Sequence, residues 1–250
     1  MNATHRTGGW CAAAAMAMTG AGAAAGVSHF ENFNTAGDYQ GWTANGNQMI
    51  FPGGNGGDYI GVPYLDFWGM TLRNDNPASG VIGDLSNLDA TTWSVDVRVF
   101  ALDTFGGDPI DPGFFPVVLE FVDYGDPDNN IPFASVYTIG AALPAVAAGW
   151  STLEYTVPST NQAALPAGWG GTGAEDPNTF EPILPVGRTY QNVMASVDEV
   201  RFTTFVPGFF YGFNLWEVGW DNVKVAPVPA PSTGVLAVLG GLAAARRRRG

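Results

Sequence analysis

The side chains that could do acid–base chemistry are almost all carboxylates. The chain has 23 Asp and Glu residues, but only two His (His5 and His29) and one Cys. A Ser-His-Asp triad or a histidine-bound zinc or iron site therefore lacks residues. Hydrolysis of a glycosidic bond needs only two suitably spaced carboxylates, and four glutamates fall on predicted strands: Glu120, Glu154, Glu199 and Glu217. No hydrolase motif accompanies them, so we expect a non-catalytic protein, with a glycan-active hydrolase or lyase as the alternative.

One short stretch is rich in side-chain oxygens. It contains Asp123, Asp126, Asp128, Asn129 and Asn130. Carboxylate and amide oxygens suit Ca²⁺, but the stretch lacks the spacing of an EF-hand loop and has no Glu at the closing position. We interpret it as a turn between two strands, with a cation site as the alternative.

Aromatic residues outside the predicted strands are candidates for sugar binding, because sugar rings have apolar faces that stack on exposed aromatic rings. Trp169 lies between two glycines in a predicted loop, and Tyr211 lies in another. We select both as ligand-binding candidates. The tryptophans on predicted strands are expected in the core, where a large ring contributes most to burial; they are Trp93, Trp150 and Trp220.

The charge of the chain is strongly acidic. Residues 27–226 hold all 23 acidic residues and five basic ones, which gives a formal charge of −18. Nucleic acid is excluded as a partner, because phosphate binding requires a basic surface. Divalent cations and neutral or cationic surfaces are favoured instead.

The residue pattern predicts an all-β fold. Residues 93–102 alternate between valines and polar residues, as in a half-buried strand, and residues 150–157, 197–205 and 216–225 do the same. Residues 116–124 are apolar on both faces apart from Glu120, which predicts a central strand. The stretches between them are rich in Gly, Pro, Asn and Asp, so we expect an antiparallel β-sandwich with long loops over residues 26–226.

Both ends of this domain resemble a known group of families. Phe30-Glu31-Asn32-Phe33 and Gly37 to Trp42 come first, and Trp220-Asp221-Asn222-Val223 comes last. They are similar to jelly-roll domains of the galactose-binding-like and carbohydrate-binding-module type, and Gly53 to Ile60 resembles the related laminin B domain. The resemblance implies that the first and last strands are neighbours and that Glu31 and Asp221 help to hold a structural calcium. The alternative is that both are solvated residues at strand ends.

The first 25 residues have the order of a secretory signal peptide. Met1 to Trp10 carries His5 and Arg6 and no acid, and Cys11 to Ala25 is a run of Ala, Met and Gly. Cleavage after Ala25 would remove Cys11, the only cysteine. We therefore expect an exported protein without disulfides or thiolate metal sites.

The last residues, 227–250, form a three-part tail. A Pro-rich segment with Val228, Pro229, Ala230 and Pro231 precedes an apolar run over 234–245, and four arginines follow: Arg246, Arg247, Arg248 and Arg249. The run is shorter than the roughly 20 residues of a stable spanning helix, and the arginines suit the cytoplasmic side of a membrane.

This layout resembles the PEP-CTERM sorting signal, although Ala230 stands where that family usually has Glu. The resemblance implies processing by an exosortase and, with it, the cell envelope or extracellular matrix of bacteria that make exopolysaccharide. An ordinary tail anchor is the alternative. Together, the patterns predict a secreted β-sandwich that binds polysaccharide or serves as a structural component of the matrix.

Overall fold

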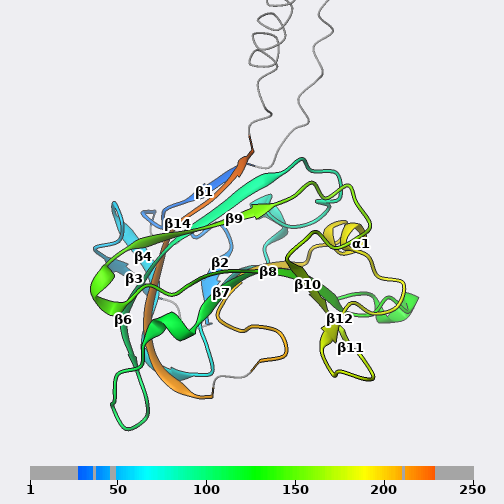
Figure 1. The fold of residues 1–250 in the computed structure, drawn as a ribbon. Helices are drawn as coiled ribbons and strands as arrows, with labels where there is room; N and C mark the ends of the chain where they lie inside the picture. Colours follow the sequence, from blue (N-terminus) through cyan, green and yellow to red (C-terminus); the bar gives the residue numbers. More distant parts are fainter. Residues whose placement is uncertain (1–27, 36–37, 46–48, 210–211, 229–250) are drawn as a thin grey trace, which may run out of the picture.

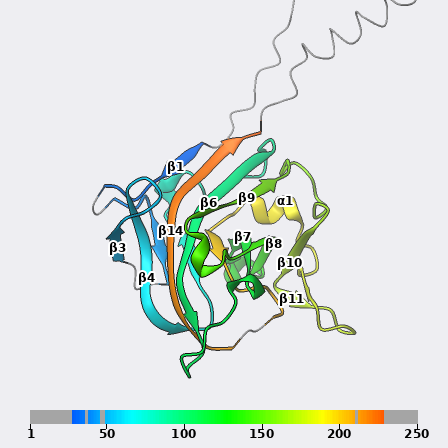
Figure 2. The same ribbon diagram turned by 60° about the vertical axis from the view of Figure 1, so that its left-hand side comes forward.

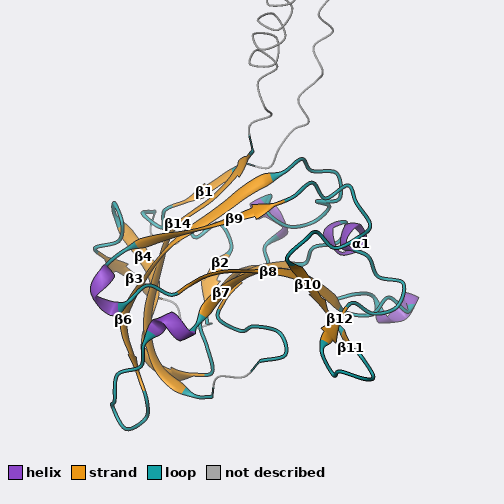
Figure 3. Cartoon of the chain, in the orientation of Figure 1, coloured by secondary structure: helices purple, strands orange, loops and turns teal. Residues whose placement is uncertain are grey.

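The computed structural model describes residues 28–35, 38–45, 49–209 and 212–228. Within them the protein is built from antiparallel strands joined by loops, with very little helix (Figures 1 and 3). The predicted signal peptide, Tyr211 and all of the tail after Val228 lie outside the described residues. No helix in the described ranges is both long and apolar enough to cross a membrane.

Two six-stranded antiparallel sheets face each other (Figures 1 and 2). Sheet A has the order β3-β4-β14-β6-β9, with β1 also paired to β14. Its strands are β1 (His29–Glu31), β3 (Met49–Pro52), β4 (Asp58–Phe67), β6 (Thr91–Asp103), β9 (Ser151–Val157) and β14 (Asn214–Pro227). Sheet B has the order β10-β8-β7-β13-β5-β2. Its strands are β2 (Trp42–Ala44), β5 (Thr71–Asn74), β7 (Pro116–Asp123), β8 (Ala134–Ala142), β10 (Trp169–Thr172) and β13 (Glu199–Thr203).

The remaining elements are short. A small hairpin joins β11 (Ala174–Glu175) to β12 (Pro182–Ile183), and the only α-helix among the described residues is α1 (Tyr190–Met194). The 3₁₀ turns are η1 (Pro77–Ser79), η2 (Pro112–Phe114), η3 (Pro127–Asn129) and η4 (Val146–Ala148). The sequence pattern missed α1 and the strands β2, β3, β4, β5, β8, β10, β11 and β12. Most of these elements have five residues or fewer, which is too short to show a period. The strands β4 and β8 have ten and nine residues, but Gly61 and Pro63 in β4 and Gly140 in β8 interrupt the strand pattern.

The core lies between the two sheets. Inward-facing valines of β6 and β7, such as Val97 and Val117, are fully buried there, as are the rings of Trp93 and Trp220. Those two tryptophans confirm the prediction for strand residues. Trp150 corrects it, because its ring lies half-buried against Tyr59 and Phe100 and lies outside the core cluster.

The last strand, β14, pairs with β4 and β6 and is paired to β1 near its end, where His29 faces Val225 and Glu31 faces Val223. The expected neighbourhood of the first and last strands is therefore confirmed. The simple alternation predicted for residues 216–225 is wrong. The register shifts between Asp221 and Lys224, and Asn222 has a φ of 48°. A bulge of this kind reverses the side-chain direction, so Trp220 and Val225 both reach the core.

Candidate functional site

A row of polar side chains crosses the outer face of sheet B. The backbone pairing aligns Tyr137 of β8 with Glu120 of β7, Glu120 with Arg201 of β13, Arg201 with Arg73 of β5, and Arg73 with Thr43 of β2. Their strand neighbours point into the core, including Leu119, Phe121, Val200 and Phe202. Because side chains alternate along a strand, these five residues lie on the opposite face. We call them the sheet B row.

Ion pairs fix the centre of the sheet B row. The guanidinium of Arg201 bonds through Nε to Glu199 Oε1, and its Nη1 lies 3.4 Å from Glu120 Oε2. Arg73 Nη1 donates to Glu199 Oε2 over 3.3 Å. Both glutamates are almost completely buried, with side-chain exposures of 6% for Glu120 and 1% for Glu199. One guanidinium thus lies between two buried carboxylates.

Neighbouring hydroxyl groups complete this network. Ser135 Oγ donates to Glu120 Oε1 over 2.5 Å, and the Tyr124 hydroxyl donates to Glu199 Oε2 over 2.7 Å. Burial raises the pKa of Glu120, which Arg201 and the Ser135 bond oppose. Burial also raises the pKa of Tyr124, followed by the bond to Glu199. The network therefore holds hydrogen-bond donors and acceptors in fixed positions on the outer face of sheet B.

A groove of about 410 Å³ opens above this network. Its lining combines Arg73, Glu199 and Arg201 with Asn45, Thr71, Thr203 and Phe205. The Thr71 and Thr203 hydroxyls lie 2.7 Å apart, and the ring of Phe205 is 40% exposed at one end. At the other end of the sheet B row, Tyr137 lies over Gly170. A Cβ at residue 170 would come within 2.3 Å of the Tyr137 ring, so a larger residue there would require this ring to move.

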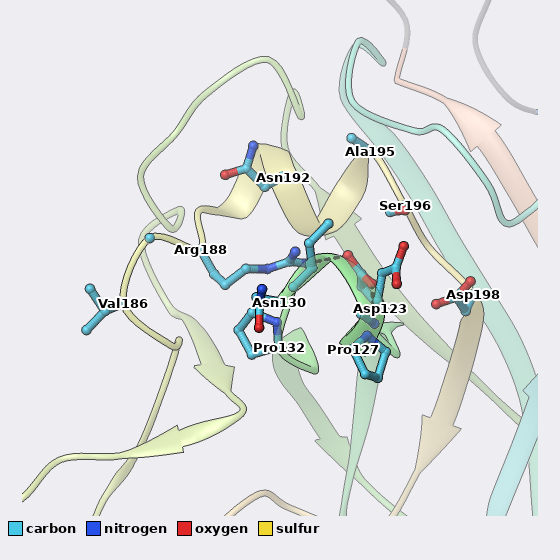
Figure 4. Close-up of a pocket in the computed structure, with 14 residues that line it drawn as sticks. Asp123, Pro127, Asn130, Pro132, Val186, Arg188, Asn192, Ala195, Ser196 and Asp198 are labelled. Atoms are coloured by element: carbon cyan, nitrogen blue, oxygen red, sulfur yellow. Dashed lines mark hydrogen bonds and ion pairs between the residues drawn. The ribbon is translucent and has the colours of Figure 1, made fainter.

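A larger depression of about 780 Å³ lies where β7 and β13 meet the loop before α1 (Figure 4). Arg188 points across it to Asp123, whose Oδ2 forms an ion pair with Nη2. Asp198 lines the same depression and accepts from the Tyr124 backbone N–H over 2.7 Å. Tyr124 and Asp198 also line a smaller depression of about 400 Å³. These two depressions therefore adjoin each other at Asp198.

The oxygen-rich stretch after β7 is a turn, as predicted. Asp126 is the N-cap of η3, and its side chain accepts from the backbone N–H groups of Asp128 and Asn129. Asn130 closes the turn with a φ of 56°. These contacts use the oxygens of Asp126 to stabilise the turn, and a cation site here stays the alternative prediction.

Glu31 and Asp221, the predicted calcium ligands, lie on the paired strands β1 and β14. Both side chains are buried. Glu31 Oε1 accepts a hydrogen bond from Phe33 N over 2.5 Å. Burial raises the pKa of Glu31, and the nearby negative charge of Asp38 raises it further. Asp221 has different charged neighbours, Asp96 and Asp58, and burial raises its pKa to about 6. The two carboxylates thus interact with different charged residues.

Asp221 is part of a closed polar network with the Gly-rich loop before β4. Its Oδ2 accepts from Asn55 N and its Oδ1 from Asn222 N, both over 2.7 Å. Asp96, opposite it on β6, accepts from the side chains of Asn55 and Asn222 and from Thr152. Over the part of the chain that the structure describes, no group of three or more His, Cys, Asp or Glu residues could hold a metal ion. Two backbone N–H groups thus bond the oxygens of Asp221, and the calcium site at Glu31 and Asp221 stays a prediction.

Trp169 begins strand β10 and does not lie in a loop. Its half-buried ring packs 6.2 Å from Phe121 and 5.5 Å from Tyr190, measured between ring centroids. Its role in sugar binding stays a prediction, and so does that of Tyr211, which lies outside the described residues.

The sequence reasoning missed the arginines of the sheet B row. The alternation of Glu199, Arg201 and Thr203 with apolar residues was a usable signal for a polar outer face. It did not reveal that Arg73, more than 120 residues away, contacts the same carboxylate as Arg201.

No family model matches the chain, and no curated protein matches it. Solved structures that it resembles include the CBM22-1 and GH10 modules of a Clostridium thermocellum endo-1,4-β-D-xylanase in complex with xylohexaose, at 10% identity and a TM-score of 0.40. Others are an agarase (10% identity, TM-score 0.39) and a carbohydrate esterase of a Shiga toxin-encoding bacteriophage (12% identity, TM-score 0.38). The matches cover 80%, 81% and 79% of this chain and 28%, 25% and 96% of those chains. The chain thus spans about a quarter of the length of the first two.

Proposed function

We propose that this protein is an exported, non-catalytic β-sandwich of jelly-roll type that binds carbohydrate on the outer face of sheet B. The observation that carries the proposal is the groove beside the sheet B row, where charged and hydroxyl groups from β5 and β13 meet the exposed ring of Phe205. Ligand sites typically combine apolar surface with a few fixed polar groups.

The chemistry of the groove suits a polyol. A sugar hydroxyl both donates and accepts, so it is satisfied best by a donor and an acceptor held side by side. The half-exposed guanidinium of Arg73 offers donors, and the partly exposed Thr71 hydroxyl can both donate and accept. Since an ion pair and a hydrogen bond already hold these side chains, little conformational entropy is lost on binding.

A role in binding is favoured over catalysis because the buried carboxylates are already paired. Glu120 and Glu199 share the Arg201 guanidinium, and further bonds from Ser135, Tyr124 and Arg73 use their other oxygens. A glycan-active hydrolase or lyase is the second candidate. It is supported by one observation, the raised pKa of Glu120, which is the property of a general acid.

The binding proposal predicts that Phe205→Ala weakens glycan binding about tenfold, through loss of the stacking ring. A glycan array would identify the ligand of the full chain, and calorimetry would compare the variants. Tyr124→Phe, which keeps the ring and removes the hydroxyl beside Glu199, should also weaken binding. Phe180→Ala, at another exposed ring on the β11–β12 turn, is the matched control.

Equal affinity for the Phe205→Ala and Phe180→Ala variants would exclude this groove. If the protein instead releases new reducing ends or unsaturated products from a glycan, and Glu120→Gln abolishes this activity, the protein is a hydrolase or lyase and not a binding protein.

The proposed location of the protein is the cell envelope or extracellular matrix. The support is the order of the sequence: a secretory signal over residues 1–25 and a Pro-rich, apolar and Arg-rich tail over residues 227–250. An exosortase-type enzyme would process the tail, and exopolysaccharide would be the natural glycan at that location. The structure describes only Val228 of the motif, which is exposed and donates its N–H to Ala90 O.

The sorting proposal predicts that the exported chain ends near residues 228–233 in cells with an exosortase-type enzyme. In cells without that enzyme, or after replacement of Arg246 to Arg249 by glycine, the chain should keep its tail. Mass spectrometry of the C-terminal peptide in membrane and extracellular fractions measures this. Identical C-termini with and without the enzyme would support an ordinary tail anchor.

A further inference from the structure

Exposed aromatic rings gather at one end of the sandwich. Four of them lie at or near the paired ends of β4, β6 and β14: Tyr64 (43% exposed), Trp68 (50%), Phe105 (60%) and Phe213 (47%). The rings of Trp68 and Phe213 meet edge to face with centroids 5.0 Å apart, and Phe105 lies 6.5 Å from Phe213. We call these four residues the aromatic pole. Contiguous exposed apolar surface of this kind marks an interaction site.

The strand ends place the aromatic pole far from the C-terminus of the domain. Phe67, the last residue of β4, pairs with Asn214 at the start of β14, and Asp103, the last residue of β6, pairs with Leu215. From there β14 runs the length of sheet A to Pro227, near the C-terminal end of the described residues (Figures 1 and 2). A chain held at its C-terminus would therefore present the aromatic pole outward.

Hydrogen bonds hold two residues of the aromatic pole in place. The loop after β6 is closed by Thr104 N to Asp108 O and Gly107 N to Thr104 O bonds of 2.9 Å, which hold Phe105 at its tip. The Tyr64 hydroxyl donates to Asp103 Oδ2 over 2.7 Å. Phe105 and Tyr64 are thus held in place, and the Asp103 carboxylate lies beside Tyr64.

The charge at this end is negative. Asp103, Asp108 and Asp111 lie on and beside the loop that carries Phe105. The described cations are used elsewhere: Arg73, Arg188 and Arg201 form ion pairs with carboxylates, and Arg98 lies 4.6 Å above the ring of Phe100. Lys224 lies near the opposite end of β14. An anionic partner would therefore be repelled, and a cationic one attracted.

We propose that the aromatic pole binds a polysaccharide that carries free amino groups, as a second site separate from the groove of sheet B. The proposal rests on the proposed carbohydrate-binding function and adds the class of sugar. Amino sugars offer an apolar ring face to Trp68 and Phe213. Their ammonium groups gain both from the faces of aromatic rings and from the carboxylates of Asp103 and Asp108, which also excludes acidic polysaccharides and anionic membrane surfaces.

The test compares oligomers of glucosamine and of N-acetylglucosamine of equal length. Acetylation replaces the ammonium group by a neutral acetamide and leaves the sugar ring unchanged. Calorimetry with the full chain at about pH 6, where such amines are protonated and exposed carboxylates ionised, should show at least about tenfold tighter binding of the glucosamine oligomer. Raising the salt from about 0.05 to about 0.5 M should remove most of the difference. Trp68→Ala and Phe105→Ala should remove the preference, and Phe30→Ala, at an exposed ring on β1, should keep it.

The outcomes separate the two sites. If Phe205→Ala weakens the binding of both oligomers while Trp68→Ala and Phe105→Ala change nothing, carbohydrate binding on sheet B stands and the aromatic pole is excluded. An equal affinity for both oligomers also overturns the proposal. If Trp68→Ala instead dissociates an oligomer of the protein in sedimentation velocity, with no change in sugar binding, the patch is a contact between copies. Absence of any glycan binding would overturn the carbohydrate function itself.

Discussion

Replacing Arg201 by methionine is expected to lower the free energy of unfolding by about 3 kcal/mol at neutral pH, because breaking a buried ion pair leaves an unpaired buried charge. Arg201 is bonded to both Glu120 and Glu199, which are inaccessible to water. Equilibrium denaturation in urea would measure the loss. It would be a large part of the stability of an ordinary domain.

The loss should depend on pH with a definite sign. Burial already raises the pKa of Glu120, and removing Arg201 removes the largest influence that opposes the rise. A raised pKa in the folded state means that folding binds a proton, so the stability of the variant should recover as the pH falls toward about 4.5. Adding Glu120→Gln and Glu199→Gln to the variant should also restore part of the stability at neutral pH.

Arg73→Met is the matched control. It removes the same charge from the same face, but its side chain is 43% exposed, so the loss should stay below about 1 kcal/mol. Equal losses for Arg73→Met and Arg201→Met would show that the buried pairs of Glu120 and Glu199 do not hold this face together.

Asp221→Asn is expected to flatten the pH dependence of stability between about pH 4 and about pH 7. Burial raises the pKa of Asp221 from 3.8 to about 6 in the folded protein. The folded state therefore keeps a proton that the unfolded state has lost, and stability falls as the pH rises through this window. The contribution of Asp221 is about 2–3 kcal/mol. Urea denaturation at a series of pH values should show that the free energy of unfolding falls by that much less in the variant than in the unaltered chain.

Asp89→Asn is the control for this measurement, because it removes one negative charge from an exposed residue. It should leave the slope close to that of the unaltered chain. If Asp89→Asn and Asp221→Asn flatten the slope equally, general repulsion among the many acidic residues, and not the burial of Asp221, causes the decline.

The same variant tests the calcium that the jelly-roll resemblance predicts. A cation bound to Asp221 stabilises the folded state that binds it. Calcium should then raise the melting temperature of the unaltered chain but not of Asp221→Asn, and a chelator should reverse the rise. Identical melting curves with calcium and with chelator would remove the predicted site at Glu31 and Asp221.

The sequence by itself predicted five of the strands, which are β6, β7, β9, β13 and β14. Alternation over residues 93–102 and the apolar character of 116–124 are local properties, so β6 and the central position of β7 could be predicted. The scarcity of His and Cys and the acidic charge excluded several classes of site through composition alone.

Only the tertiary structure decided which side chains meet. In the sheet B row, Arg201 of β13 pairs with Arg73 of β5 and with Glu120 of β7. These three strands are far apart in the chain. The alternation of residues along a strand predicts that a side chain faces outward, but it does not predict which strand lies beside it.

Two local departures were equally invisible in the sequence. The bulge at Asn222 turns Val223 and Val225 into the core, and the outward ring of Trp150 finds its partner in Tyr59 on another strand. Both depend on the register of neighbouring strands. Register is set by the packing of the whole sandwich, so a single strand read alone carries no record of it.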